Sequence, residues 1–169
     1  HPFEPDAAPP GRDVPMMLGT NRTENSLFIG GANPAIFDVT WEQLPQVMRQ
    51  SYPDKDVEAI IAGYRALQPE ATAADVYFEA TTDSRWLAGH VQQAERKVLQ
   101  AGAAAYLYLF NWDTPVDGGK WRSPHALEIG FVFDNVANSE SMSGSGSEQQ
   151  RIADMMADTW IVFARTGTP

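Results

Sequence analysis

The chain has 169 residues, of which 43% are hydrophobic, so it is long and apolar enough for one domain with a sizeable core and is not typical of a disordered protein. Its formal net charge of −10 and its lack of any basic run argue against nucleic acid and anionic membrane as partners, because both are bound through clustered Lys and Arg. The absence of cysteine excludes disulfides, thiolate nucleophiles and Cys-based zinc sites, and no stretch approaches the about 18 apolar residues of a membrane-spanning helix.

Two short apolar stretches are predicted to be buried β-strands. Val14–Thr20 has a proline near its start, where a missing N–H is tolerated. Ala103–Phe110 is apolar on both faces, which is expected inside a parallel sheet covered by helices. A polar loop follows each stretch, at residues 21–26 and 111–124. If the two strands are parallel neighbours, both loops lie outside the carboxyl ends of the strands, where α/β proteins keep their chemistry.

About five helices are predicted, three of them from apolar residues at helical spacing and the first from residues 40–43 (TWEQ), which resemble a capping box. They span Thr40 to about Gln50, Asp54–Leu67, Ala73–Thr82, Leu87–Val98 and the region from Ile152 to the glycine at 167. A short helix is also expected to begin at Leu27. The Gly/Ser-rich stretch 139–147 has the composition of a flexible linker. Two strands and about five helices leave an α/β sheet incomplete, so this inventory predicts a larger partner.

The sequence contains none of the motifs that bind metals, nucleotides or dinucleotides. His1, His90 and His125 show no HExxH or other short ligand spacing, so we predict no metal site and no cofactor. His90 borders the apolar face of its helix and is interpreted as structural. Asn21 opens an Asn-Arg-Thr glycosylation sequon, which we attribute to chance because it directly follows a buried strand.

Glu24 and His125 are the candidate catalytic residues. Each lies just past the end of a predicted strand, so neighbouring parallel strands would bring both side chains into one crevice. A carboxylate bonded to one imidazole nitrogen fixes the tautomer and raises the basicity of the other nitrogen. Position alone leaves a non-catalytic alternative open, because a glutamate and a histidine in loops are usually solvated.

Four segments, in the same order along the chain, resemble the type-B carboxylesterase family. Residues 14–24 (VPMMLGTNRTE) resemble the segment with the catalytic acid, where an apolar strand runs into G-x-(N/T)-(R/K)-D-E-G. Residues 123–133 (SPHALEIGFVF) look like the histidine segment, H-(G/A)-x-E-(I/L)-x-(F/Y)-V-F. Residues 160–169 look like W-x-x-F-A-(R/K)-x-G-x-P, and residues 1–6 are similar to the loop before the acid strand in bacterial, para-nitrobenzyl-esterase-like members.

The resemblance implies that residues 1–169 form the C-terminal part of one α/β-hydrolase catalytic domain. It assigns Glu24 as the acid and His125 as the general base of a Ser-His-Glu triad, with Glu128 in a supporting role. The serine would come from an N-terminal part that carries the nucleophile elbow G-x-S-x-G, which this sequence lacks. The implied substrate is a small-molecule carboxylic ester. Four apolar side chains are candidate pocket residues, with ordinary core or loop packing as the alternative for the three aromatic ones: Leu27, Phe28, Trp112 and Trp121.

Two departures from the family pattern bear on function. Asp-Glu-Gly is Thr23-Glu24-Asn25 here, which keeps the acid but loses the glycine. Where cholinesterases carry aromatics after the acid, this chain has Leu27 and Phe28, so one aromatic of a choline-binding surface is absent. A general esterase is therefore favoured over a cholinesterase. The alternatives are a non-catalytic cholinesterase-like binding or adhesion module and a stand-alone helical domain that resembles the family by chance.

Overall fold

The computed structural model of the chain describes residues 8–169. The segment 1–6, whose sequence resembles a family loop, lies outside the described residues. Two parallel strands form the sheet: β1 (Met16–Asn21) and β2 (Ala105–Phe110). Met16 lies opposite Ala105, and Asn21 lies opposite Phe110, so the two carboxyl ends are level. Both predicted strands are confirmed, and each begins two residues later than its apolar stretch.

Seven α-helices accompany the strands within the described residues. They are α1 (Leu44–Ser51), α2 (Val57–Leu67), α3 (Ala73–Thr82), α4 (Ala88–Leu99), α5 (Ile129–Val132), α6 (Glu140–Ser143) and α7 (Ser147–Thr166). The five predicted helices correspond to α1–α4 and α7, and the last one ends at Gly167 with φ +78°. None of the helices in residues 8–169 is both long and apolar enough to cross a membrane.

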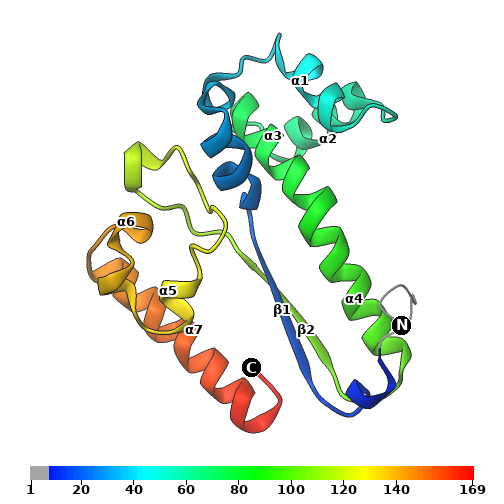
Figure 1. Cartoon of the computed structure of the whole chain (residues 1–169), viewed down its shortest axis with the longest axis vertical. Coiled ribbons are helices and arrows are strands. Elements are labelled where there is room, and N and C mark those ends of the chain that lie inside the picture. Colours follow the sequence, from blue (N-terminus) through cyan, green and yellow to red (C-terminus); the bar gives the residue numbers. More distant parts are fainter. Residues whose placement is uncertain (1–7) are drawn as a thin grey trace.

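The helices form two layers around the strand pair and a cap at one end of it. Helix α4 runs along one face of the strands, α7 lies on the other face, and α1–α3 gather beyond the carboxyl ends (Figure 1). The buried core is divided in the same way. One apolar cluster lies within α1–α3 and is centred on Phe78, and a second lies between β2, α5 and α7 and is centred on Phe131.

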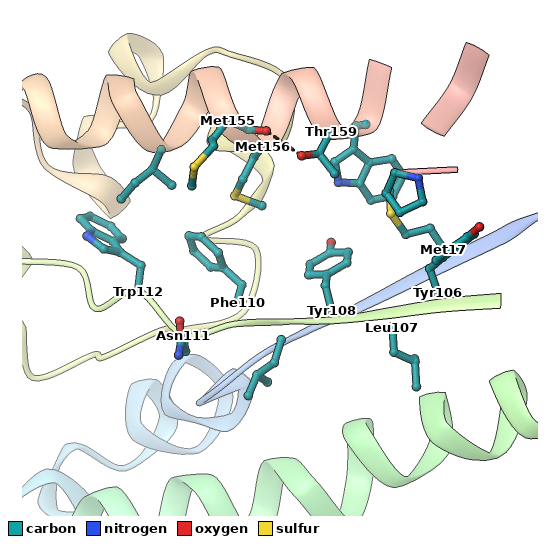
Figure 2. Close-up of a pocket in the computed structure, with 14 residues that line it drawn as sticks. Met17, Tyr106, Leu107, Tyr108, Phe110, Asn111, Trp112, Met155, Met156 and Thr159 are labelled. Atoms are coloured by element: carbon teal, nitrogen blue, oxygen red, sulfur yellow. Dashed lines mark hydrogen bonds between the residues drawn. The ribbon is translucent and has the colours of Figure 1, made fainter. Parts of the chain in front are cut away.

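Side chains on β2 alternate between the two layers. Tyr108, Phe110 and Trp112 point toward α7, whereas Leu107 points toward α4 (Figure 2). The ring of Tyr108 lies directly over Gly19 of β1, so a Cβ at that position would be 1.8 Å from the ring. Gly19 is therefore required by a close side-chain approach across the strand pair.

Several boundaries differ from the sequence-based expectations. Helix α1 begins at Leu44 rather than at Thr40, because residues 40–43 form a turn in which the Gln43 side chain accepts from the Thr40 N–H at 3.1 Å. A π-helical turn, Asp83–Leu87, joins α3 to α4. The short helix expected at Leu27 is a π-helical turn, Ser26–Gly30.

The helices α5 and α6 are not predicted by the sequence pattern. Each is only four residues long, too short to produce a recognisable apolar periodicity. Helix α6 lies inside the Gly/Ser stretch 139–147, where the Ser143 side chain is fully buried and donates to the carbonyl of Ser139 at 3.0 Å. The segment therefore has defined local structure, while its flexibility stays a prediction.

Candidate active site

The loop that carries Glu24 follows β1 without any spacer. Asn21 is the last residue of the strand, and its backbone N–H donates to Glu24 Oε1 at 2.7 Å. Only 6% of Glu24 is exposed. The end of the strand thus fixes one carboxylate oxygen and leaves the second oxygen, Oε2, for another donor.

The loop that carries His125 is attached to the Glu24 loop by a reciprocal pair of hydrogen bonds. The Thr23 N–H donates to the Ser123 carbonyl at 3.0 Å, and the Ser123 N–H donates to Thr23 Oγ1 at 2.9 Å. The Ser123 hydroxyl also donates to the carbonyl of Phe110, the last residue of β2, at 2.9 Å. These bonds connect both strand ends and both loops within two residues of the candidate side chains.

Glu24 and His125 meet in a direct hydrogen bond. His125 Nδ1 lies 2.7 Å from Glu24 Oε2. A carboxylate only accepts, so Nδ1 is the donor in this bond, and Nε2 is the ring nitrogen that is free to take part in proton transfer. The Glu24 side chain is 8% exposed, whereas the His125 side chain is 40% exposed. The acid is therefore buried, and the histidine remains accessible to a reacting group.

The side chain of Asn21 connects the end of β1 to the histidine loop and to Glu128, whose supporting role stays a prediction. The buried Asn21 amide donates to the Pro124 carbonyl at 2.8 Å and also to Glu128 Oε2. With this amide engaged and only 1% of Asn21 exposed, the sequon is closed to glycosylation in the folded chain. Burial raises the pKa of Tyr108 to about 12, with the charges of Glu128 and Glu24 adding to the effect.

Two aromatic side chains lie against the imidazole. The ring centroid of Phe28 is 4.7 Å from that of His125, and the centroid of Trp86 is 5.5 Å away. Phe28 was among the pocket candidates, and it is half exposed. Trp86 is not among the pocket residues that the sequence predicts. It lies in the turn between α3 and α4, and no spacing in the sequence relates it to His125. Its indole N–H donates to Asn25 Oδ1 at 3.3 Å, next to Glu24.

The other three pocket candidates line two cavities whose linings do not include His125. Leu27 and Trp121 line a separate cavity of about 200 Å³ together with Pro124. Trp112 packs on Phe131 and lines an apolar groove of about 590 Å³ between β2 and α7 (Figure 2). Pocket roles for all four candidates stay predictions.

The remaining described histidine, His90, has a structural contact. Its Nδ1 lies 2.7 Å from the hydroxyl of Thr20, a buried residue of β1. This contact attaches α4 to the strand pair, in agreement with the structural role predicted for His90. Within residues 8–169, no three His, Asp or Glu side chains are gathered in a way that could hold a metal ion.

The parallel strands, the helices on both faces and the paired loops at the strand ends define the class, part of an α/β-hydrolase fold, as predicted. Residues 1–169 match the model of the carboxylesterase family, and the chain belongs to that family.

Two relatives illustrate the match. The para-nitrobenzyl esterase of Bacillus subtilis (strain 168) is 25% identical over 158 residues, which are 92% of this chain and 30% of that protein. The crystal structure at pH 6.2 of a carboxylesterase from Geobacillus stearothermophilus superimposes with a TM-score of 0.71 and 26% identity, over 92% of this chain and 32% of that one. The chain thus spans about a third of the length of these relatives.

Proposed function

We propose that this chain supplies the acid and the base of a Ser-His-Glu triad that hydrolyses carboxylic esters. The observation that carries the proposal is the 2.7 Å bond between Glu24 Oε2 and His125 Nδ1, at the level carboxyl ends of two paired parallel strands. Membership of the carboxylesterase family supports the reaction class. The serine nucleophile belongs to a segment with G-x-S-x-G outside residues 1–169, because this sequence has no such motif.

The proposed reaction is acyl transfer to water in two halves. His125 Nε2 takes the proton of the serine hydroxyl while the serine oxygen forms a bond to the ester carbonyl carbon. Collapse of the tetrahedral intermediate breaks the carbon–oxygen bond to the alcohol, which leaves with the proton from Nε2. In the second half, His125 takes a proton from water while the water oxygen forms a bond to the acyl carbon. The bond between the acyl group and the serine oxygen then breaks, which releases the carboxylic acid and regenerates the serine hydroxyl.

Glu24 has two tasks in this mechanism. Its carboxylate holds the proton on Nδ1, so that Nε2 is the basic nitrogen, and it stabilises the imidazolium formed in each half-reaction. The bond from the Asn21 N–H keeps the carboxylate oriented while the ring gains and loses a proton. Oxyanion donors are assigned to the segment that carries the serine.

Small-molecule esters with an apolar acyl or alcohol group are the proposed substrates. Phe28 and Trp86 present apolar ring surface beside the imidazole, where such a group would pack. The curated relative is by name an esterase of a para-nitrobenzyl compound, and we extend that class of ester to this chain.

A complementation assay tests the proposal. The purified chain alone is expected to hydrolyse para-nitrophenyl acetate at the background rate, because removing one triad member typically costs several orders of magnitude. Addition of a separately expressed segment with G-x-S-x-G is expected to restore hydrolysis, and His125→Ala is expected to prevent the restoration. The proposal fails if the chain alone shows saturation kinetics that His125→Ala abolishes, or if the complemented His125→Ala protein stays fully active.

A further inference from the structure

Helix α3 carries two carboxylates that bind the two candidate catalytic loops through arginines. Arg22 lies two residues before Glu24, and Arg122 lies three residues before His125. Glu79 accepts from Arg22, and Asp75 accepts from Arg122. We propose that these two ion pairs are a positioning device that sets the Glu24–His125 hydrogen bond, an inference that rests on the proposed function for its catalytic meaning.

The pair on the acid loop is buried and shared. Glu79 is only 4% exposed and also accepts from the side chain of Gln68, so both of its oxygens have donors. Arg22 uses its second terminal nitrogen to donate to Asp113, in the loop after β2, at 2.5 Å. Its backbone N–H donates to the Phe110 carbonyl at 2.9 Å. Arg22 thus connects β1, β2 and α3 at the start of the acid loop.

The pair on the histidine loop is bidentate. Arg122 Nε donates to Asp75 Oδ1 at 2.7 Å, and Nη2 donates to Asp75 Oδ2 at 3.3 Å. This fork fixes the orientation of the guanidinium as well as its position. Arg122 has φ +57°, a left-handed conformation that a non-glycine residue adopts at a cost in energy. Two contacts hold this strained residue, which lies two positions before the loop's proline. One is the ion pair with Asp75, and the other is the bond from the Thr114 N–H to the Arg122 carbonyl at 2.8 Å.

Helix α3 is suited to act as the common support. All ten of its residues are buried, which immobilises the helix between the α1–α2 layer and the strand ends. Its N-terminus is a capping box in which Thr72 and Asp75 bond reciprocally, so Asp75 is fixed to the backbone as well as to Arg122. Between the pairs lies a cavity of about 320 Å³ lined by Arg22, Asp75 and Arg122 among others, which gives an unsupported guanidinium room to move.

The geometry explains why both pairs bear on one hydrogen bond. Glu24 and His125 belong to loops that touch through Thr23 and Ser123, so displacement of either loop changes the separation of Glu24 Oε2 and His125 Nδ1. A misplacement of about 1 Å in a catalytic group costs about a hundredfold in rate. The ion pairs act through the loops and make no contact of their own with the imidazole.

The direct test is the tautomeric state of His125 in the 169-residue chain. Long-range proton–nitrogen spectra, recorded over a pH series that includes the neutral imidazole, distinguish a protonated Nδ1 from a protonated Nε2. The wild-type chain is expected to show protonated Nδ1, and Glu24→Ala defines the spectrum without the bond. Arg22→Gln and Arg122→Gln are each expected to shift the spectrum toward that of Glu24→Ala.

Two control variants separate positioning from stability. Val76→Ala truncates a buried side chain on the same helix and lowers stability without touching either ion pair. Arg49→Gln removes an ion pair of the same kind with Glu58, but at an exposed place on α1 and α2. Both controls are expected to keep the wild-type spectrum at temperatures where they remain folded. Arg122→Lys keeps the positive charge but cannot form the bidentate contact with Asp75. Its spectrum is expected to lie between those of the wild type and Arg122→Gln.

A double-mutant cycle on each pair makes the inference specific. Arg22→Gln and Glu79→Gln together are expected to shift the spectrum by no more than Arg22→Gln alone, because removing Arg22 already removes its contact with Glu79. In the complemented enzyme, the Arg22 and Arg122 variants are expected to lower kcat at least about tenfold while the KM changes little.

The outcomes distinguish this inference from the proposed function. Arg22→Gln and Arg122→Gln spectra identical to the wild-type spectrum would overturn the positioning role and leave the triad in place. The same role is also overturned if Val76→Ala shifts the spectrum as much as the arginine variants. A wild-type spectrum identical to that of Glu24→Ala would instead contradict the Glu24–His125 bond and, with it, the proposed function.

Discussion

At the scale of single residues, the candidate site is organised around the two oxygens of Glu24. One accepts from the backbone of β1 and the other accepts from His125, so the strand orients the Glu24 carboxylate and the carboxylate orients the imidazole. Their places just past the two predicted strands make both side chains candidates, and the resemblance to type-B carboxylesterases assigns one as the acid and the other as the base. The sequence does not predict the contact of Trp86 with His125 or the hydrogen bond from the Asn21 amide to Glu128, because these residues come from segments with no common pattern.

The charged residues around α3 also predict an acid sensitivity. Burial on its own would raise the pKa of Asp75, but the hydrogen bonds from Arg122 and Thr72 outweigh it and hold the pKa below its ordinary value. A carboxyl whose pKa is lower in the folded state stabilises the fold above its unfolded pKa of about 3.9, and that contribution is lost as the pH falls toward the folded pKa.

Asp75→Asn is therefore expected to lower the free energy of unfolding by about 1–3 kcal/mol at pH 7 and by much less at pH 3. Urea unfolding of the wild type and the variant at both pH values measures the difference. A loss of stability that is equal at pH 7 and pH 3 would contradict the assignment of the lowered pKa to Asp75.

At the scale of elements, long periodic segments are predicted well and short ones are not. Helices α2, α4 and α7 follow from their apolar spacing, and both strands follow from their composition. Helices α5 and α6 depend on tertiary contacts, as the burial of Phe131 and Ser143 indicates. The pattern of residues 40–43 predicts a capping box, of which the structure has only the bond from the Thr40 N–H to Gln43, and a complete capping box is formed by Thr72 and Asp75.

The strand pair gives a prediction about glycine. Gly19→Ala is expected to destabilise the fold by about 1–3 kcal/mol, because the added Cβ would overlap the ring of Tyr108. Gly63→Ala is the matched control, since Gly63 lies in α2 with open space around it. That change is expected to stabilise by about 1 kcal/mol through helix propensity. Thermal or urea unfolding of both variants tests the contrast, and two changes of the same sign would refute it.

At the scale of the whole molecule, the described structure exposes surface that a parallel sheet normally covers. Leu107 and Leu109 on β2 are 45% and 47% exposed, and Ile161 and Val162 on α7 are exposed to a similar extent. The sequence predicts this imbalance, because its strands are too few for its helices. The chain spans only 30–32% of the length of the relatives described above, and a larger partner that covers this surface stays a prediction.

Glu24 and His125 are proposed to activate a serine that lies outside residues 1–169. The most direct measurement is covalent trapping with a fluorophosphonate ester in the complemented enzyme, followed by peptide mass spectrometry. We predict a single phosphonylated serine, located in the G-x-S-x-G segment, and a labelling rate that falls by several orders of magnitude in His125→Ala. Labelling of a serine within residues 1–169, or a rate unchanged by His125→Ala, would contradict the claim.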